Sequence, residues 1–232
     1  MTHKDSVEAL CGSLEWMERR LPHVRAAGAT AVHRLIPIAH EDNAQGDVVR
    51  ALLLGCYNGR DFPFQLNSIR VLDRAVLDDC LALLHMDSHP EIEVHQHLED
   101  GSAVFSGLAE RWKQPGTLLA MPTHRDDVIS EVLRTIGTKS LQRLIQVSSG
   151  SSGQCRYVAK FLAGCYDGAQ FPFDLTEFRC MDHELFLDCL AVIRLLYETR
   201  DGIQGNVPSG DEVFGRLIAQ WSIKQYTGGR GR

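Results

Sequence analysis

Four histidines fall within thirteen residues in the first half of the chain, where they could bind a transition-metal ion. They are His85, His89, His95 and His97. Histidines four residues apart share one face of a helix, and a following His-x-His pair supplies further imidazole ligands of the kind that zinc and nickel accept. Such a site would make the protein a metal-dependent enzyme or a metal sensor. We favour the plainer interpretation, in which these are surface histidines of a polar loop and no cofactor binds.

Two aspartates, Asp73 and Asp182, occupy matching places on two similar apolar helix stripes. A carboxylate in such a place must be paired or neutral, because burying a lone charge is costly. The candidate partners are Arg70 and Arg179, three residues earlier, or Arg34 and Arg143 from an earlier helix. No second acid or histidine is matched in both segments, so a structural ion pair is predicted rather than a catalytic group. On this interpretation, Asp182→Leu is better tolerated than Asp182→Ala.

The common signatures of enzymes are missing from the sequence. It contains no Gly-x-Ser-x-Gly, no glycine-rich phosphate loop ending in Lys-Ser/Thr, and no His-Glu-x-x-His. The seven cysteines are an odd number and form no Cys-x-x-Cys pair, which argues against both a disulfide scaffold and a zinc knuckle. We therefore expect a non-enzymatic cytoplasmic protein whose cysteines are reduced and buried.

The matching aspartates belong to an internal duplication. Residues 25–112 align with residues 134–221 without a gap, and 27 of the 88 pairs are identical. Seventeen of these identities lie between Gln45 and Ala82. A repeat period of 109 residues is too long for a solenoid, so the sequence predicts two domain-sized copies, each with a core of its own.

Each copy is predicted to be an all-α bundle of about four helices. In the first copy, apolar residues recur at helical spacing over four segments, which are His23–His40, Gln45–Asn58, Leu66–Met86 and Ala103–Trp112. A further helix is expected at Ser6–Arg20. The predicted plan is an N-terminal helix (1–22), a first domain (23–112), a linker (113–126), a second domain (127–226) and a disordered tail (227–232).

A Phe-Pro-Phe segment follows the second helix of each copy. Proline holds the preceding residue extended, so the flanking rings project from a fixed connection. We expect these four rings to pin the connection onto the core. They are Phe62, Phe64, Phe171 and Phe173.

The second copy resembles a bacterial family of uncharacterised helical proteins carried on plasmids and mobile elements of proteobacteria. The resemblance rests on a Gly-x-x-Gly-Gln-x-Arg-x-Val-Ala segment, a Phe-Asp-Leu-Thr helix start and a following aspartate. These positions are Gly150, Gly153, Gln154, Arg156, Val158, Ala159, Phe173, Asp174, Leu175, Thr176 and Asp182. The resemblance covers residues 139–221 and is weaker in the first copy. It implies no activity, but it points to an accessory protein of a mobile element.

Composition and charge argue against two classes of protein, those that span a membrane and those that coat nucleic acid. The chain is 44% hydrophobic and 23% charged, as in ordinary globular proteins, and no apolar stretch is long enough to cross a membrane. A net charge of −6 argues against a protein that coats nucleic acid. The matched starts of the two copies differ in sign, however. The second is basic (Arg134, Lys139, Arg143, Arg156 and Lys160), whereas the first is acidic (Glu41, Asp42 and Asp47).

The leading hypothesis is a non-enzymatic protein–protein interaction module of a mobile genetic element. Within that class we favour a regulator or inhibitor of a host defence complex, in an anti-CRISPR-like role, and self-association stays open. The alternatives are the metal-dependent protein above and a nucleic-acid-binding regulator that uses the Arg134–Lys160 face and the GGRGR tail. The copies diverge most after the long helix, so a partner is expected at Met86–Asp100 and Leu195–Ser209. Because no core stripe continues beyond Leu84, exchanging these segments should leave folding intact.

Overall fold

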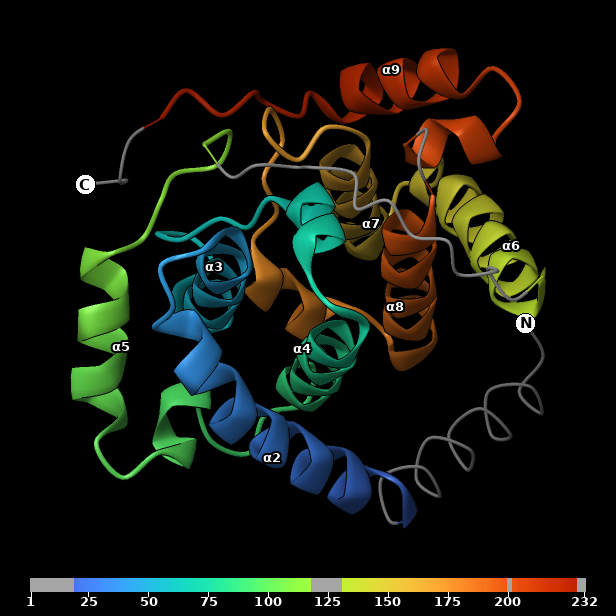
Figure 1. Cartoon of the computed structure of the whole chain (residues 1–232). Helices are drawn as coiled ribbons and strands as arrows, with labels where there is room; N and C mark the ends of the chain where they lie inside the picture. Colours follow the sequence, from blue (N-terminus) through green and yellow to red (C-terminus); the bar gives the residue numbers. More distant parts are fainter. Residues whose placement is uncertain (1–18, 118–130, 200–201, 229–232) are drawn as a thin grey trace.

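The computed structural model describes residues 19–117, 131–199 and 202–228, and these ranges contain eight α-helices and four short 3-10 helices. The first repeat comprises α2 (Leu21–Ala39), α3 (Ala44–Asn58), η1 (Leu66–Val71), α4 (Arg74–Asp87), η2 (Val94–His97) and α5 (Gly101–Glu110). The second comprises α6 (Glu131–Ser148), α7 (Gly153–Tyr166), η3 (Leu175–Cys180), α8 (His183–Glu198), η4 (Ile203–Asn206) and α9 (Gly210–Trp221). Figure 1 traces this order from blue to red. The predicted all-α, duplicated architecture is confirmed.

Parts of the predicted plan lie outside the described residues. These parts are residues 1–18 of the predicted N-terminal segment, 118–126 of the linker, 127–130 and 200–201 of the second domain, and 229–232 of the tail. Within the described ranges, no helix is long and apolar enough to cross a membrane.

The long helix predicted over Leu66–Met86 is broken in both repeats. Leu72 and Asp73 take extended backbone angles, with ψ of 146° and 152°, which ends η1 and starts α4. The Leu72 side chain is fully buried, and the backbone N–H of Asp73 donates to Gln45 Oε1 of α3 at 2.7 Å. Gln154 accepts the equivalent bond in the second repeat at 2.8 Å. A 3-10 helix, an extended kink and an α-helix in succession can place apolar residues at nearly the same spacing as one continuous helix. The spacing of apolar residues in the sequence therefore did not reveal the break.

The two repeats are related by an approximate two-fold axis that passes between Phe64 and Phe173. These equivalent residues form an isolated antiparallel bridge, in which the Phe64 N–H donates to the Phe173 carbonyl at 2.8 Å and the reverse bond measures 2.9 Å. A residue that pairs with its own counterpart must lie at the axis. All four rings of the Phe-Pro-Phe segments are buried.

Two equivalent glycines allow the repeats to approach closely. A Cβ atom on Gly55 would lie 2.8 Å from Leu175 Cδ1, and one on Gly164 would lie 3.0 Å from Leu66 Cδ1. Each glycine sits on the second helix of its repeat and receives a leucine from the first turn of the other repeat's 3-10 helix. The two matched glycines are therefore a contact point between the repeats.

One continuous core runs through both repeats, so the expectation of a separate core in each copy is wrong. The buried cluster joins residues of α2–α4 to residues of α6–α8 without a break. The cause is the exchange of 3-10 helices, since η1 packs on α7 and α8 while η3 packs on α3 and α4.

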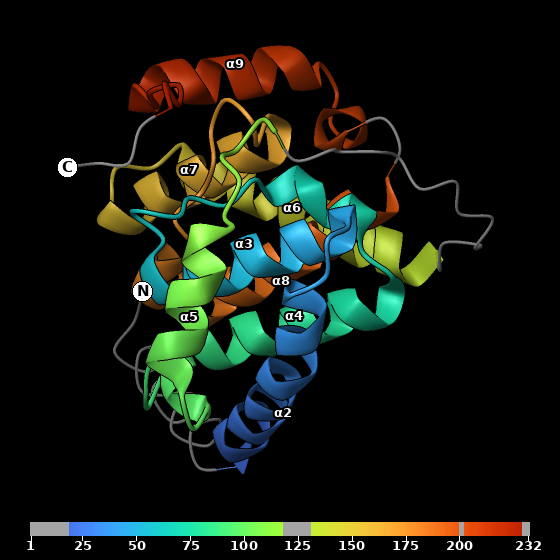
Figure 2. The same ribbon diagram turned by 60° about the vertical axis from the view of Figure 1, so that its left-hand side comes forward.

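The outer helices complete the layers around this core. Figure 1 shows α2, α4, α8 and α6 in that spatial order, and α2 packs on α4 just as α6 packs on α8. Figure 2 shows α9 lying across α7, and α5 beside α3. After α9 the chain runs extended, where the Tyr226 N–H donates to the Gln170 carbonyl at 2.7 Å.

Candidate functional site

The best candidate for a binding site is a cleft of about 660 Å³ in the second repeat, which we call the basic cleft. Its walls are α7, the connection from α7 to η3, the extended segment after α9, and the end of α3 with the residues that follow it. The lining residues are Gly59, Arg60, Pro63, Arg156, Lys160, Phe171, Pro172, Phe173, Asp174, Glu177, Trp221 and residues 222–228. Both repeats thus contribute to it.

Three cations at this cleft form no ion pair within the described residues. Arg60, Arg156 and Lys224 are exposed, and none of them forms an ion pair or side-chain hydrogen bond with the part of the chain that the structure describes. They come from the turn after α3, from α7 and from the extended segment after α9. Like charges gathered around one hollow raise its positive potential and favour an anionic ligand.

The two acids of the lining are already engaged. Glu177 pairs with Lys160, and burial raises the pKa of the Glu177 carboxyl while the hydrogen bond from Lys160 opposes that shift. Asp174 Oδ1 accepts from the backbone N–H of Thr176 at 3.0 Å and from its hydroxyl at 2.6 Å, so it caps η3. These contacts leave the three cations as the groups available to a ligand.

The far wall is held by contacts near the C-terminal end of α9. Trp221 Nε1 donates to the Ser148 carbonyl of α6 at 2.7 Å, and Gln225 Nε2 donates to Gln170 Oε1 at 2.8 Å. The adjoining Tyr226 backbone bond to Gln170 continues this attachment. The segment that carries Lys224 therefore has a fixed place opposite α7.

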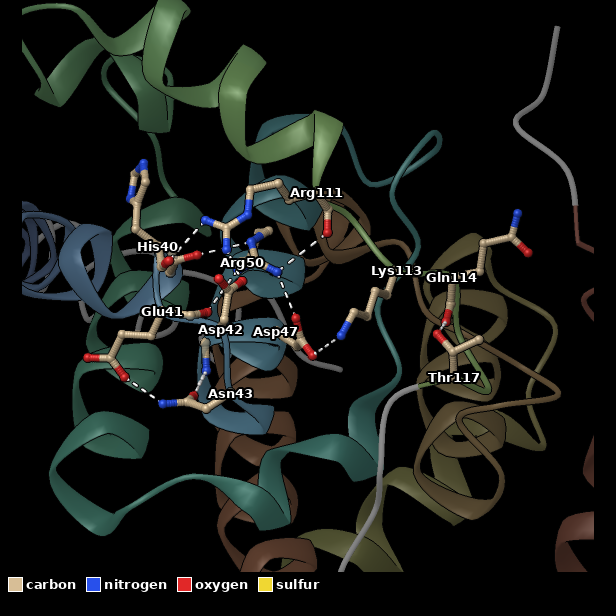
Figure 3. A network of polar contacts seen from close by, with 12 residues as sticks. His40, Glu41, Asp42, Asn43, Asp47, Arg50, Arg111, Lys113, Gln114 and Thr117 are labelled. Atoms are coloured by element: carbon tan, nitrogen blue, oxygen red, sulfur yellow. Dashed lines mark hydrogen bonds and ion pairs between the residues drawn. The ribbon is translucent and has the colours of Figure 1, made fainter.

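In the matching region of the first repeat, a buried arginine joins three structural elements (Figure 3). Arg50 is 2% exposed. Its Nε donates to the Ala39 carbonyl at 3.0 Å, Nη2 donates to the Glu41 carbonyl at 3.1 Å, and Nη1 donates to Asp47 Oδ1 at 2.7 Å. Nη1 also reaches the Arg111 carbonyl at 3.4 Å. This one side chain ties the end of α2, the start of α3 and the end of α5 together.

Comparing equivalent positions shows how the charges of the two regions differ. Asp47 pairs with both Arg50 and Lys113, whereas its counterpart in the second repeat is the unpaired Arg156. The counterpart of Arg50 is Ala159, which has no polar group to satisfy. Within the described residues, the acidic Asp47 of the first repeat is therefore paired, whereas Arg156 at the equivalent position of the second repeat forms no ion pair.

The predicted burial of Asp73 and Asp182 is wrong. Both are exposed residues immediately before α4 and α8, and neither side chain caps its helix. Arg34 and Arg143 do pair with acids across the helix layer, but with different ones. Arg34 pairs with Asp79, and Arg143 Nη2 donates to Asp188 Oδ1 at 2.9 Å.

In the second repeat, Asp188 is the carboxylate whose removal should lower the free energy of unfolding. It is buried, its Oδ1 accepts from Ser140 Oγ at 2.7 Å, and burial raises its pKa while Ser140 and Arg143 oppose the shift. Asp188→Ala should cost about 1–3 kcal/mol, because it strands a buried hydroxyl. Asp182→Ala and Asp182→Leu should differ by less than about 0.5 kcal/mol at an exposed site. Chemical denaturation compares the three variants, and an Asp182 variant as costly as Asp188→Ala would contradict the assignment.

The four candidate metal histidines are divided between two places. His85 stacks on His183 of the second repeat, with ring centroids 5.9 Å apart, and His89 meets the same ring at 5.7 Å. His95 instead contacts the ring of Tyr57 at 5.1 Å. Across the described ranges, no group of three or more His, Cys, Asp or Glu side chains has an arrangement suited to a metal ion. His97 lies with His95 on η2, so the four do not form one site.

Acid should destabilise the protein between about pH 6.5 and pH 4 through His85. Burial, and then the nearby His183 and His89, lowers the pKa of His85 from 6.5 to about 4. As the pH falls below 6.5, the unfolded chain takes up the proton that the folded chain resists, so stability falls until about pH 4. With allowance for partial exposure, we expect a loss of about 1–2 kcal/mol. The free energy of unfolding, measured by denaturation at several pH values, should fall less steeply with acid in His85→Leu than in the wild type. An equal fall in both proteins would contradict this assignment to His85.

The segment Met86–Asp100 is not the free surface loop that its divergence suggested. Val94 is fully buried, and Arg179 of the second repeat donates from Nη2 to Asp87 at 2.8 Å and to Glu93 at 3.1 Å. Burial raises the pKa of Asp87, and the hydrogen bond from Arg179 partly offsets it. The expectation that no core residue follows Leu84 is wrong, so exchanging this segment would disturb both the core and an inter-repeat ion pair.

Comparison with known proteins places the repeats in a family. The family model described as a family of unknown function (DUF7673) matches twice, at residues 29–113 and at residues 138–222. No curated protein and no solved structure matches the chain. The two matches cover most of both repeats and reproduce the duplication found by internal alignment. The chain therefore belongs to the family of unknown function DUF7673 and carries its unit twice in tandem.

Proposed function

We propose that this protein is a non-enzymatic protein-binding module that holds an acidic segment of a partner protein in the basic cleft. The observation that carries the proposal is the unpaired state of Arg60, Arg156 and Lys224 around one hollow of about 660 Å³. A partner that supplies carboxylates there would complete in trans the kind of pairing that Asp47 and Lys113 make within the first repeat.

Electrostatics favour an acidic peptide over a nucleic acid at this site. The lining contains Asp174 and Glu177 between the cations, and the whole chain carries a net charge of −6. A continuous phosphate backbone would pass close to these acids, whereas separate side-chain carboxylates can meet the cations one by one. Nucleic-acid binding is the second candidate, because Trp221 and Tyr226 add aromatic rings of the kind on which bases stack.

The biological setting belongs to the same proposal. We place the protein in the cytoplasm, encoded by a plasmid or other mobile element of a proteobacterium, as a regulator or inhibitor of a host defence complex. The free cysteines support a reducing compartment, since five of the six in the described residues are buried thiols. The sequence resemblance supports the mobile element, and the open cleft supports action by docking rather than by catalysis.

A competition binding assay with two probes distinguishes acidic-peptide binding from nucleic-acid binding. A fluorescent Glu/Asp-rich peptide should bind the protein at low salt, and its affinity should fall as salt is raised. An unlabelled single-stranded oligonucleotide of similar length should displace it poorly. Displacement by the oligonucleotide at a lower concentration than the unlabelled peptide would favour the nucleic-acid alternative. Failure of both probes to bind at low salt would remove the basic cleft as an anion site.

A further inference from the structure

The two repeats satisfy one equivalent backbone carbonyl in different ways. In the first repeat, Arg50 Nε donates to the carbonyl of Ala39, the last residue of α2, at 3.0 Å. The counterpart of Ala39 is Ser148, the last residue of α6, and the counterpart of Arg50 is Ala159, whose side chain has no donor. The Ser148 carbonyl accepts instead from Trp221 Nε1 at 2.7 Å. The last residue of α9 therefore supplies in the second repeat the hydrogen bond that a buried arginine supplies in the first.

The same tryptophan differs from its counterpart in its ring contacts. In the first repeat, Trp112 packs edge-on against Phe62, with ring centroids 5.4 Å apart. The counterparts of these two residues are Trp221 and Phe171. Within the part of the chain that the structure describes, Trp221 makes no ring contact with Phe171, and both residues line the basic cleft. The two rings that contact each other in the first repeat thus both border the hollow in the second.

The basic cleft has apolar surface beside its cations. Five of its apolar lining residues are only half-buried, and they are Pro63, Pro172, Trp221, Ile223 and Tyr226. Ligand sites in proteins are typically concave and mostly apolar, with a few polar groups that fix orientation. A ligand that carries carboxylates alone would leave the apolar part of this cleft in contact with water, without the gain in free energy that its burial provides.

The cations and the apolar residues lie close enough for one short segment to meet both. Lys224 lies between Ile223 and Tyr226 in the extended segment after α9, and Arg60 lies three residues before Pro63. Consecutive Cα atoms of a peptide are about 3.8 Å apart, so neighbouring residues of a bound segment can reach groups of both kinds. The lining therefore suits a ligand in which acidic and apolar side chains alternate within a few residues.

We propose that the acidic partner segment carries one large apolar side chain, which binds against Pro172, Trp221 and Tyr226 while its carboxylates meet the cations. This inference rests on the proposed function and specifies which acidic segments the basic cleft selects. The Trp221 ring is held by its hydrogen bond to Ser148, so it offers a preformed surface that loses little freedom on binding. Charge attracts acidic segments of many kinds, whereas an anchored side chain discriminates among them.

Two labelled peptides of equal length and charge test the anchor. Both are Glu/Asp-rich, and they differ only at one central position, which is phenylalanine in one peptide and serine in the other. At low salt the phenylalanine peptide should bind about tenfold more tightly or better, because its ring leaves water on binding. Raising the salt should weaken both peptides and leave the ratio of their affinities nearly unchanged, since salt screens charges and not apolar burial. Fluorescence anisotropy measures both affinities.

Tyr226→Ser and a matched control test where the phenylalanine binds. Tyr226→Ser removes one ring of the cleft and leaves the backbone N–H that donates to Gln170. The preference for the phenylalanine peptide should then fall to about threefold or less. Ile136→Ser removes an apolar side chain that is 50% exposed on α6 and does not line the cleft. In this control the preference should stay at about tenfold or more.

Three results would overturn the inference. Equal affinity of the two peptides for the wild type would exclude the anchor and leave acidic-peptide binding intact. No binding of either peptide at low salt would remove the proposed function and the anchor with it. A preference that Tyr226→Ser does not reduce, or that Ile136→Ser reduces as much, would place the phenylalanine outside the basic cleft.

Discussion

Arg50→Met should lower the free energy of unfolding by about 3–5 kcal/mol, which corresponds to a drop in Tm on the order of 10 °C. The guanidinium is buried and donates to carbonyls at the end of α2 and of α5 as well as to Asp47. Methionine fills much of the space but leaves those carbonyls and part of the carboxylate without a donor. Urea denaturation of the two proteins measures the difference.

Arg34→Met provides the matched control for this prediction. Arg34 also pairs with an aspartate, but its side chain is 55% exposed. An exposed pair contributes about 0–1 kcal/mol, so this variant should unfold close to the wild type. If Arg50→Met is as stable as Arg34→Met, the network of Figure 3 is not what holds the ends of α2 and α5 onto α3.

Reversing two cations of the basic cleft should abolish capture of an acidic peptide. Arg156→Glu and Lys224→Glu each replace an attraction by a repulsion, and we expect about tenfold weaker binding for each and about a hundredfold for the pair. Neither side chain makes an ion pair or hydrogen bond within the described protein, so stability should be unchanged. Fluorescence anisotropy with the labelled Glu/Asp-rich peptide measures the loss.

A control variant with the same change in net charge distinguishes binding at the cleft from long-range attraction by the charge of the whole protein. Arg134→Glu with Lys139→Glu makes the same change of four units on exposed positions of α6, away from the cleft. Affinity should fall far less than in the cleft variant. An equal loss in both double variants would mean that long-range charge, and not the cleft, attracts the peptide.

The helices and the duplication could be predicted from the sequence because both leave local patterns. Apolar residues at helical spacing mark α3 and α7, and matching residues 109 positions apart mark the repeats. The fusion of the two cores could not be predicted in the same way. Gly55 and Leu175 belong to different repeats, and nothing in either local pattern shows that they meet.

The candidate site was only partly visible in the sequence. The change from acidic Asp47 to basic Arg156 at one matched position is a sequence observation, and in the structure Asp47 is ion-paired whereas Arg156 lines the basic cleft. Lys224 and Arg60 could not be assigned to the same cleft, because they lie far apart in the chain and join only through the fold. Arg50 was missed for another reason, since an arginine within an apolar helix segment looks like a solvated residue until its carbonyl partners are placed.

The most direct test of the account is the number of acidic peptides that one chain binds. Isothermal titration of the wild-type protein with the Glu/Asp-rich peptide at low salt should give one saturable site per chain. Arg156 and Lys224 line the basic cleft, whereas the position that matches Arg156 in the first repeat is Asp47, which already pairs with Arg50 and Lys113. The Arg156→Glu, Lys224→Glu variant should give no measurable heat. Two equivalent sites per chain, or one site that survives in the variant, would contradict the assignment of binding to the basic cleft.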